Sequence, residues 1–549
     1  MGAMWTYPEN TGPDVDYLAD LRGAASVAHI YGQNLVGAES MTSRGPAWAW
    51  SPNKLKSIAD LEFALGVNRF EIHESAHQPV ADMAPGLTLG PYGLWFNRNE
   101  TWAEESKPWV TYLSRCSYLL QQGHFYGDVA YFYGEEGPLT AVFGWKAMED
   151  APEGYGFDFV NSDVLLHHMS FKDGRLITPG GASYRILYLG GRSRRMTLPV
   201  LIEIKELVTQ GAVVVGSKPI DSPSLSDDEK QFQIIADQLW GKQNSLGPSV
   251  RKVGKGRVYS GMSANEVLAA LDDARDFEYT KPEADAELMF VHRKLTDGDI
   301  YFVDNRRNRA ESVNATFRVE SYKPEIWDAA TGTTKPVSYQ IANGRTTIPL
   351  RFDAYGTVFV VFRKPAASMS LKLAEPVETL VPIAEEKLNR NWLVDFQPGW
   401  GAPRQTVPLD RLTSWSNSSN TEIKYFSGTA TYQKTIQIPA GVITPSSHIW
   451  LDLGDVEDVA KVYVNGKDGG IIWKAPYKID VTGDLVSGSN QLRVEVTNLW
   501  VNRLIGDQQP WALKKYAFAD FAPYKADSPL LPSGLLGPVR VWSVTGPVP

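Results

Sequence analysis

The chain has 549 residues, of which 43% are hydrophobic and 21% are charged, a composition typical of a folded protein with more than one core. Its net charge of −9 gives no basic footprint, so neither nucleic acid nor an anionic membrane surface is an expected partner. No stretch is long and apolar enough to predict a membrane span, and the single cysteine, Cys116, excludes an internal disulfide.

Residues 1–120 alternate helical and strand patterns. Their first residues lack the pattern of a signal peptide, so the compartment stays open. Helices are predicted over 18–31, 51–66 and 108–123, and strands over 35–38 and 67–75. Strand–helix–strand units form parallel sheets whose chemistry lies at the carboxyl ends of the strands, so we expect a site there.

Residues 121–272 predict a small doubly wound, flavodoxin-like α/β domain. A strand over 184–191 is followed by a helix over 198–211 and a strand over 212–216. The glycines near residue 190 lack the spacing of a dinucleotide fingerprint, so no nucleotide cofactor is expected.

Beyond residue 272 the helical patterns give way to short strands. Residues 273–365 predict a β-sandwich, and residues 366–387 form a linker rich in Pro, Ala and Glu. Residues 388–549 have period-two runs and an Asn465-Gly466 turn, which predict a jelly-roll, galactose-binding-like sandwich. The predicted fold class is therefore multidomain, α/β plus all-β.

Two predicted strands carry candidate catalytic groups. Glu39 follows the apolar run 35–38, and the strand 67–75 carries Glu71, His73 and Glu74, with His77 just beyond. A pair of carboxyl groups on either side of a bond is what glycoside hydrolysis needs, one as acid and one as base or nucleophile. His73 and His77 do not predict a zinc protease, because that site needs HExxH on a continuous helix.

Each candidate also has a structural interpretation. Glu39 could cap the next helix or pair with Arg44, and the two histidines could lie in a core. Glu74 is better suited to hydrogen bonding or metal binding than to acting as the second catalytic acid. The chain has 17 Trp, and Trp48, Trp50, Trp95 and Trp102 are either a platform for sugar rings or ordinary packing.

Four ordered segments resemble one known family. They are "HIYGQNLVGAESMTS", "LGVNRFEIHESAHQP", "GPYGLWFNRNETWAE" and "YLSRCSYLLQQGHFYGDVAYFYGEE". They are similar to late catalytic-domain segments of glycoside hydrolase family 106, the α-L-rhamnosidases, and the similarity continues through the whole chain. The resemblance implies a (β/α)₈ barrel and an inverting enzyme that releases terminal α-L-rhamnose from plant polysaccharides or glycosides. It also implies a calcium ion that contacts the sugar.

By position in the family, Glu39 falls at the seventh barrel strand and resembles the general base. His73, Glu74 and His77 fall at the eighth strand and resemble substrate or calcium contacts. A barrel takes about 250 residues, whereas about 120 precede the second domain here. We therefore expect the C-terminal part of a barrel, without the partner acid, and a truncated chain that is inactive alone.

Two other functions fit the same sequence. One is a non-catalytic carbohydrate-binding protein that uses the C-terminal sandwich. The other is a β-galactosidase-like hydrolase, because a small α/β domain also follows the barrel in that group. The expected ligands are rhamnose-containing glycans or glycosides, and the oligomeric state stays open.

Overall fold

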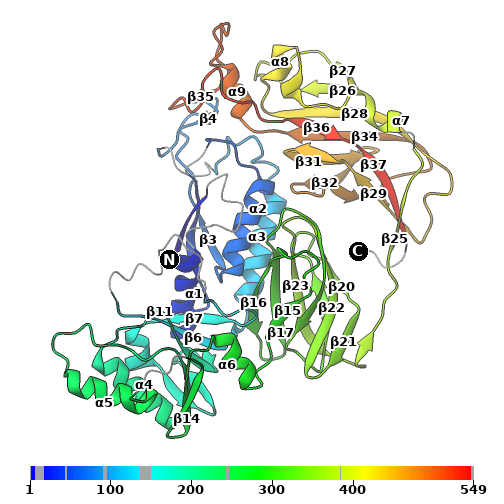
Figure 1. Cartoon of the computed structure of the whole chain (residues 1–549). Coiled ribbons are helices and arrows are strands. Elements are labelled where there is room, and N and C mark those ends of the chain that lie inside the picture. The colour runs from blue at the N-terminus through cyan, green and yellow to red at the C-terminus, as the bar shows by residue number, and fades with distance from the viewer. Residues whose placement is uncertain are drawn as a thin grey trace.

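The computed structural model of the chain describes residues 2–6, 18–43, 46–90, 96–136, 150–242, 247–383 and 385–545. The elements gather around a small parallel sheet, a larger α/β sheet and two β-sandwiches (Figure 1). The small sheet and its helices lie in the middle of the molecule, with the larger α/β sheet below, the first sandwich to one side and the second above. The fold is β-rich and multidomain, with a minority of helices.

The described strands β1, β2 and β3 of the first 120 residues form the small parallel sheet, in the order β1-β2-β3. The strands are β1 (Gly2–Thr6), β2 (Gly37–Ser43) and β3 (Arg69–Ile72); the helices are α1 (Leu18–Tyr31), α2 (Pro52–Ala64) and α3 (Lys107–Leu120). The three helices confirm the predicted ones. Strand β1 was not predicted, because its five residues include only one β-branched residue, Thr6. Among the described residues these three strands form an open sheet and no closed barrel.

Helix α2 begins and ends where its sequence indicates. Pro52 lies in the first turn, where a missing N–H leaves no hydrogen bond unmade. Gly66 follows the last turn with φ of 103°, and a Cβ added there would lie 2.8 Å from the Cβ of Ala25. The helix contacts β2 on one side and the first sandwich on another, and most of its residues are buried.

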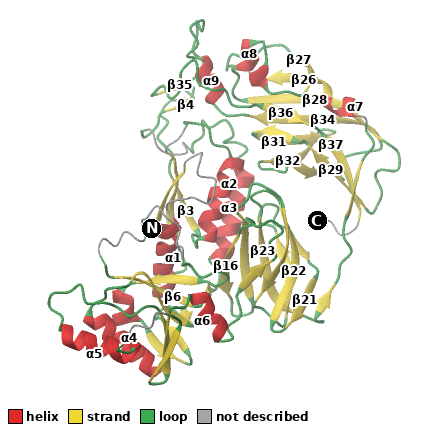
Figure 2. Ribbon diagram, viewed as in Figure 1, coloured by secondary structure: helices red, strands yellow, loops and turns green. Residues whose placement is uncertain are grey.

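The larger α/β sheet has the strand order β13-β14-β12-β11-β6-β7 and is parallel except at β13 (Figure 2). Its strands are β6 (Val129–Gly134), β7 (Phe157–Val160), β11 (Ile186–Arg192), β12 (Val213–Val215), β13 (Ser249–Val253) and β14 (Gly256–Ser260); its helices are α4 (Leu198–Gln210), α5 (Glu229–Trp240) and α6 (Ala264–Ala270). Val214 belongs to the core under α4 and α5, whereas Val213 and Val215 belong to the core under α6. A sheet covered on both faces explains the continuous apolar runs of this segment.

The first sandwich packs two antiparallel sheets around an aromatic core. One sheet has β15 (Phe277–Tyr279), β18 (Glu311–Phe317), β22 (Arg345–Phe352), β21 (Tyr339–Ala342) and β24 (Ser370–Leu371); the other has β20 (Thr334–Pro336), β19 (Tyr322–Trp327), β23 (Thr357–Pro365), β17 (Asp299–Asn305), β16 (Leu288–Lys294) and β5 (His124–Phe125). Strand β5 comes directly after α3, so the end of the first unit contributes an edge strand to this sandwich.

The second sandwich also has two antiparallel sheets around one core. The larger sheet has β27 (Val407–Arg411), β26 (Arg390–Phe396), β28 (Thr429–Ile438), β34 (Gly488–Thr497), β31 (Val459–Val464) and β32 (Lys467–Ile472); the smaller has β25 (Val377–Leu380), β37 (Arg540–Thr545), β29 (Ser447–Asp452) and β33 (Lys478–Asp480). The helices α7 (Glu385–Asn389), α8 (Thr421–Lys424) and α9 (Val501–Gly506) lie around them. The segment predicted as a linker carries β24 and β25, which belong to different sandwiches.

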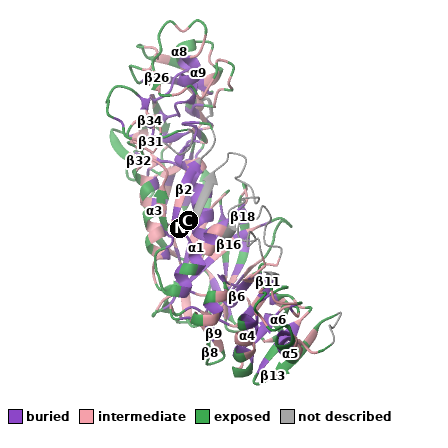
Figure 3. Ribbon diagram, turned by 90° about the vertical axis from the view of Figure 1, so that its left-hand side faces the viewer, coloured by how far each residue is buried: buried purple, intermediate pink, exposed green. Residues whose placement is uncertain are grey.

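The second sandwich returns to contact the first unit. Strands β35 (Phe518–Ala519) and β4 (Pro85–Gly86) pair in parallel, and the Trp500 indole N–H donates to the Asn99 carbonyl oxygen at 2.7 Å. Figure 3 shows an elongated molecule in which β2 and α3 lie between the second sandwich at one end and the α/β sheet at the other. In the described part of the chain no helix has the length and apolar character needed to cross a membrane.

Candidate active site

Glu39 is the third residue of β2, the central strand of the small parallel sheet. The sequence predicted a strand that ends before Glu39, but β2 continues to Ser43. Glu39 is half-buried, and its Oε1 accepts a hydrogen bond from the Thr42 hydroxyl at 2.7 Å. The carboxylate is therefore held toward the carboxyl edge of the sheet, the edge at which parallel α/β enzymes place their chemistry.

The backbone between Glu39 and Thr42 is strained. Met41 has φ of 63°, a left-handed conformation that is unusual for a residue with a side chain, and it is fully buried. The register of β1 against β2 shifts at the same place. This irregularity turns the strand so that the Thr42 hydroxyl reaches Glu39. Strained residues concentrate at functional sites, so the observed φ supports a functional role for this strand end.

Glu71 on β3 lies in register with Glu39, so the two side chains share one face of the sheet. Their carboxylates differ in direction. A Cβ added to Gly37 would lie 3.6 Å from Glu71 Oε1, and the Arg69 Nε lies 4.0 Å from the same oxygen. Glu71 therefore reaches back toward the amino end of β2, and its side chain is 44% exposed. The geometry does not make it a catalytic partner of Glu39.

His73 and Glu74 follow β3 directly at the same edge. The His73 backbone N–H donates to the Ser40 carbonyl oxygen at 2.9 Å, which places His73 beside the strand that carries Glu39. Its Nδ1 is buried without a hydrogen-bond partner among the described residues, and its Nε2 lies 4.0 Å from Glu74 Oε2. Glu74 Oε1 accepts from the Leu89 backbone N–H at 3.1 Å. His77 is exposed, so the core interpretation does not apply to it.

A second acid lies behind β2. Ser40 is fully buried on the opposite face of the strand, and its hydroxyl donates to Glu62 Oε2 on α2 at 2.5 Å. Burial raises the pKa of Glu62 to about 8, although the hydrogen bond from Ser40 opposes the shift. The raised pKa favours the neutral, protonated form of Glu62, which bonds to β2 without adding a charge next to Glu39.

Glu39 had two structural interpretations, as a cap of the next helix and as a partner of Arg44. Glu39 does not cap the following helix, because α2 begins at Pro52 with Ser51 in the capping position. Arg44 lies outside the described residues.

The predicted sugar platform lies in the interior. Trp48 is 1% exposed and packs with Trp500 and Phe521. Trp102 is 0% exposed, and its indole N–H donates to the Trp50 carbonyl oxygen at 3.1 Å. Because protein covers these rings, their burial favours packing over sugar stacking. Trp95 lies outside the described residues.

Sequence reasoning missed Glu100, on the loop between β4 and α3. Its side chain is buried, and neither carboxylate oxygen has a hydrogen-bond partner among the described residues. Burial raises its pKa well above the ordinary value. Nothing in the pattern "NRNETW" distinguishes this glutamate from an exposed one, because its burial depends on the second sandwich closing over the loop.

The calcium ion implied by the resemblance needs a set of oxygen ligands. Within the described ranges no group of three or more His, Cys, Asp or Glu side chains is arranged to hold a metal ion. Calcium takes about six to eight oxygen ligands. Calcium sites also use backbone and amide oxygens, so the calcium ion stays an expectation from the resemblance, and no catalytic step is assigned to it.

Carboxylates at the carboxyl ends of parallel strands are the groups that glycoside hydrolysis uses. The chain belongs to glycoside hydrolase family 106, because the family model described as alpha-L-rhamnosidase matches residues 1–341. The structure of a rhamnosidase from Novosphingobium sp. PP1Y is similar over 99% of this chain, with 44% sequence identity and a TM-score of 0.91. The similarity covers 51% of that rhamnosidase, so this chain spans about half of its length.

Two further proteins are similar to this chain. A candidate beta-glucuronidase of Formosa agariphila is 27% identical, over 94% of this chain and 64% of its own length. A family 42 beta-galactosidase from G. stearothermophilus has 12% identity and a TM-score of 0.40, over 66% of this chain and 59% of its own. That last score is too low to support a conclusion about fold or function.

Proposed function

We propose that this chain carries part of the active site of an α-L-rhamnosidase, which releases terminal α-L-rhamnose from plant polysaccharides or glycosides with inversion. The sheet β1-β2-β3 is the C-terminal part of a (β/α)₈ barrel in this proposal, and the second sandwich is a jelly roll of galactose-binding type. The observation that carries the proposal is Glu39, a carboxylate held at the carboxyl edge of β2 by Thr42.

Glu39 acts as the general base. Its other oxygen, Oε2, removes a proton from a water molecule, and the resulting nucleophile attacks the anomeric carbon of rhamnose from the side opposite the leaving oxygen. His73 and Glu74, at the end of the neighbouring strand, bind the sugar. In an inverting enzyme the acid stands about 6.5–9.5 Å from the base, and no residue of β1 or β3 is assigned that role.

The proposal is tested with a chimera. The half of the Novosphingobium rhamnosidase that this chain does not cover is joined to this chain, and release of L-rhamnose from an aryl α-L-rhamnoside is measured with calcium and with a chelator. NMR of the first anomer released reports the stereochemistry. A folded chimera without rhamnosidase activity, or one that retains the anomeric configuration, contradicts the proposal.

A β-glucuronidase is a second candidate, because the Formosa agariphila relative carries that description. An aryl β-glucuronide in the same assay distinguishes the two substrates. The non-catalytic alternative predicts glycan binding by the chain that persists after residues 1–120 are deleted.

A further inference from the structure

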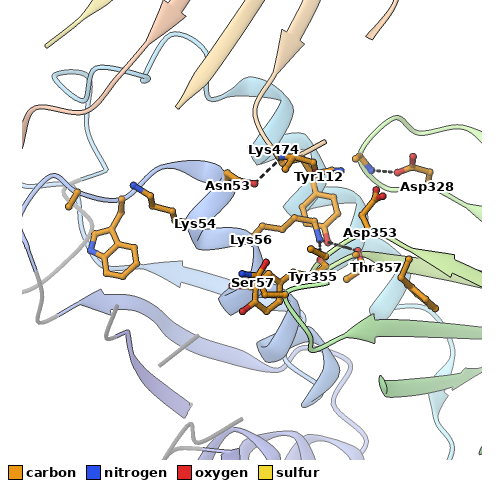
Figure 4. A pocket seen from close by; sticks show the side chains of 18 of the residues that line it. Asn53, Lys54, Lys56, Ser57, Tyr112, Asp328, Asp353, Tyr355, Thr357 and Lys474 are labelled. Carbon is orange, nitrogen blue, oxygen red and sulfur yellow. Dashed lines mark hydrogen bonds between the residues drawn. The ribbon is translucent and has the colours of Figure 1, made fainter. Parts of the chain in front are cut away.

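The second sandwich contacts the first unit around a cavity of about 590 Å³ (Figure 4). There the Ala475 backbone N–H donates to the Asn53 side-chain oxygen, at the start of α2, at 3.0 Å. Glu39, His73 and Glu74 are not among the described residues that line this cavity. This contact therefore joins the two parts of the molecule outside the proposed active site.

A second contact lies beside the end of β3. Strand β35 of the second sandwich pairs with β4, and the Phe518 N–H donates to the Ala84 carbonyl oxygen at 2.8 Å. Asp520, two residues further along, accepts two hydrogen bonds from Thr88. Its Oδ2 accepts from the Thr88 backbone N–H at 3.1 Å, and its Oδ1 accepts from the Thr88 hydroxyl at 3.0 Å. The second sandwich therefore fixes the position of Thr88.

The residue after Thr88 contacts the proposed active site. The Leu89 backbone N–H donates to Glu74 Oε1 at 3.1 Å, although the Leu89 side chain faces solvent. The Glu74 side chain is 13% exposed, and its Oε2 lies 4.0 Å from His73 Nε2. The bond from Leu89 therefore holds one oxygen of the Glu74 carboxylate and keeps the other beside His73.

The residue before Thr88 is held from the opposite side. The buried Gln78 side chain bonds both polar backbone groups of Leu87: its oxygen accepts the N–H at 2.9 Å, and its nitrogen donates to the carbonyl oxygen at 2.6 Å. Gly86 has φ of 99°, and a Cβ there would collide with Gln78 Oε1. Leu87 is therefore fixed from the side of β3, whereas Thr88 depends on Asp520.

We propose that Asp520 is a positioning residue of the active site: it fixes Thr88, so that the Leu89 N–H orients the Glu74 carboxylate for binding of the sugar. This inference rests on the proposed function, because it takes Glu74 to be a sugar contact. Asp520 is 432 residues from Thr88 in the sequence. The second sandwich is in this proposal a component of the active site and not a separate binding module.

The test is a double-mutant cycle in the active chimera, because a residue that acts through another has no effect once the other is removed. Asp520→Ala is expected to raise KM for an aryl α-L-rhamnoside about three- to tenfold and to leave kcat within about twofold, because it disturbs sugar binding and not the base. Glu74→Ala also raises KM, and Asp520→Ala added to it is expected to raise KM no further. Asp520 is exposed, so its substitution keeps the fold.

Two control variants remove similar bonds elsewhere. Asn53→Ala removes the contact with Ala475, so it loosens the second sandwich outside the active site. Asp480→Ala removes the same pair of bonds inside the second sandwich, where Asp480 accepts from the Thr482 N–H at 2.9 Å and from its hydroxyl at 2.5 Å. Both variants are expected to keep KM within about twofold of the parent.

A second measurement does not depend on hydrolysis. Hydrogen exchange of the Thr88 and Leu89 backbone amides is followed by mass spectrometry in the 549-residue chain. Asp520→Ala is expected to speed exchange at both amides about tenfold, because Thr88 loses its acceptor and Leu89 its fixed position. Asn53→Ala is expected to leave both rates unchanged.

Four results overturn the inference: an unchanged KM in Asp520→Ala, additive effects of Asp520→Ala and Glu74→Ala on KM, an equal rise in KM in Asn53→Ala, or unchanged exchange at Leu89 in Asp520→Ala. Failure of the proposed function gives a different result, a folded chimera without rhamnosidase activity. The exchange rates then still decide whether Asp520 fixes the segment that holds Glu74. Failure of this inference alone leaves the parent chimera active.

Discussion

Glu39 and Glu71 occupy paired positions on neighbouring parallel strands, yet their carboxylates reach toward opposite ends of the sheet. Glu39 is bonded to Thr42, three residues nearer the carboxyl edge, whereas Glu71 lies against Gly37 and Arg69 near the amino edge. Glu71 is therefore a control for Glu39, since the two glutamates lie on the same face of one sheet and are predicted to differ in function.

In the active chimera, Glu39→Gln is expected to lower kcat by about 10²–10⁴-fold, because the amide cannot remove a proton from water. Glu71→Gln is expected to leave kcat within about threefold of the parent. Release of L-rhamnose from an aryl rhamnoside measures both. Equal losses in the two variants would remove Glu39 from its assigned role.

The 549-residue chain without the added half is expected to be inactive on the same substrate. The reason is that no partner acid has been placed beside Glu39 in the described sheet. Turnover by this chain that disappears in Glu39→Gln would show that it completes its own catalytic pair.

Glu62 is expected to make stability fall as pH rises. Its folded pKa of about 8 lies above that of an unfolded glutamate, so its stabilising contribution is full below the unfolded pKa and is lost as pH rises through the folded value. Glu62→Gln keeps an acceptor for Ser40 and removes the titration. Urea unfolding at about pH 5 and about pH 9 should show a smaller pH effect in the variant than in the parent. An unchanged pH effect would mean that Glu62 is ionised in the folded chain.

Substitution of His292 is expected to destabilise the first sandwich more than most other substitutions there. Its buried ring contacts Asp276 Oδ2 at 2.9 Å and Asp299 Oδ1 at 2.8 Å. Burial acts to lower its pKa, but the two carboxylates outweigh burial and raise it. His292→Ala leaves two buried carboxylates without this partner and should cost about 3–5 kcal/mol in the free energy of unfolding.

The control for His292→Ala is His448→Ala, because the 3.0 Å contact of His448 with Asp480 is exposed and its loss should cost at most about 1 kcal/mol in the free energy of unfolding. Because the folded pKa of His292 is raised, the stability that its charge supplies is lost as pH rises through that value. A similar cost in both variants, measured by urea unfolding, would contradict this assignment.

A substitution of Trp48 distinguishes a packing role from a sugar-binding role. If its ring belongs to the core that it forms with Trp500, Trp48→Ala should cost about 3–5 kcal/mol in the free energy of unfolding. A sugar platform predicts instead a small change in stability with weaker glycan binding. Thermal unfolding together with glycan titration distinguishes the two.

Much of the architecture could be predicted because each element carries its own local signal. The helical period of α1, the glycine after α2 and the apolar run of β12 are local features, and the structure confirms them. Strand β1 and the short strands β24 and β25 were missed, because their pairing depends on distant partners and not on their own few residues.

Part of the candidate site could be predicted because its residues also follow a local strand pattern. Glu39, His73 and Glu74 were placed at one sheet edge from the strand pattern, and the hydrogen bond from His73 to Ser40 supports that placement. The burial of Trp48 and Glu100 could not be predicted, because it is produced by the second sandwich, about 400 residues further along the chain.

The chain between the two sandwiches is short and exposed, since β24 ends at Leu371 and β25 begins at Val377. The second sandwich nevertheless touches the first unit through Trp500, Ala475 and Tyr524. A protease that cuts within 372–376 would therefore produce two fragments that migrate as one particle under native conditions. In this molecule the second sandwich follows the first sandwich along the chain, yet it is also held to the first unit by non-covalent contacts.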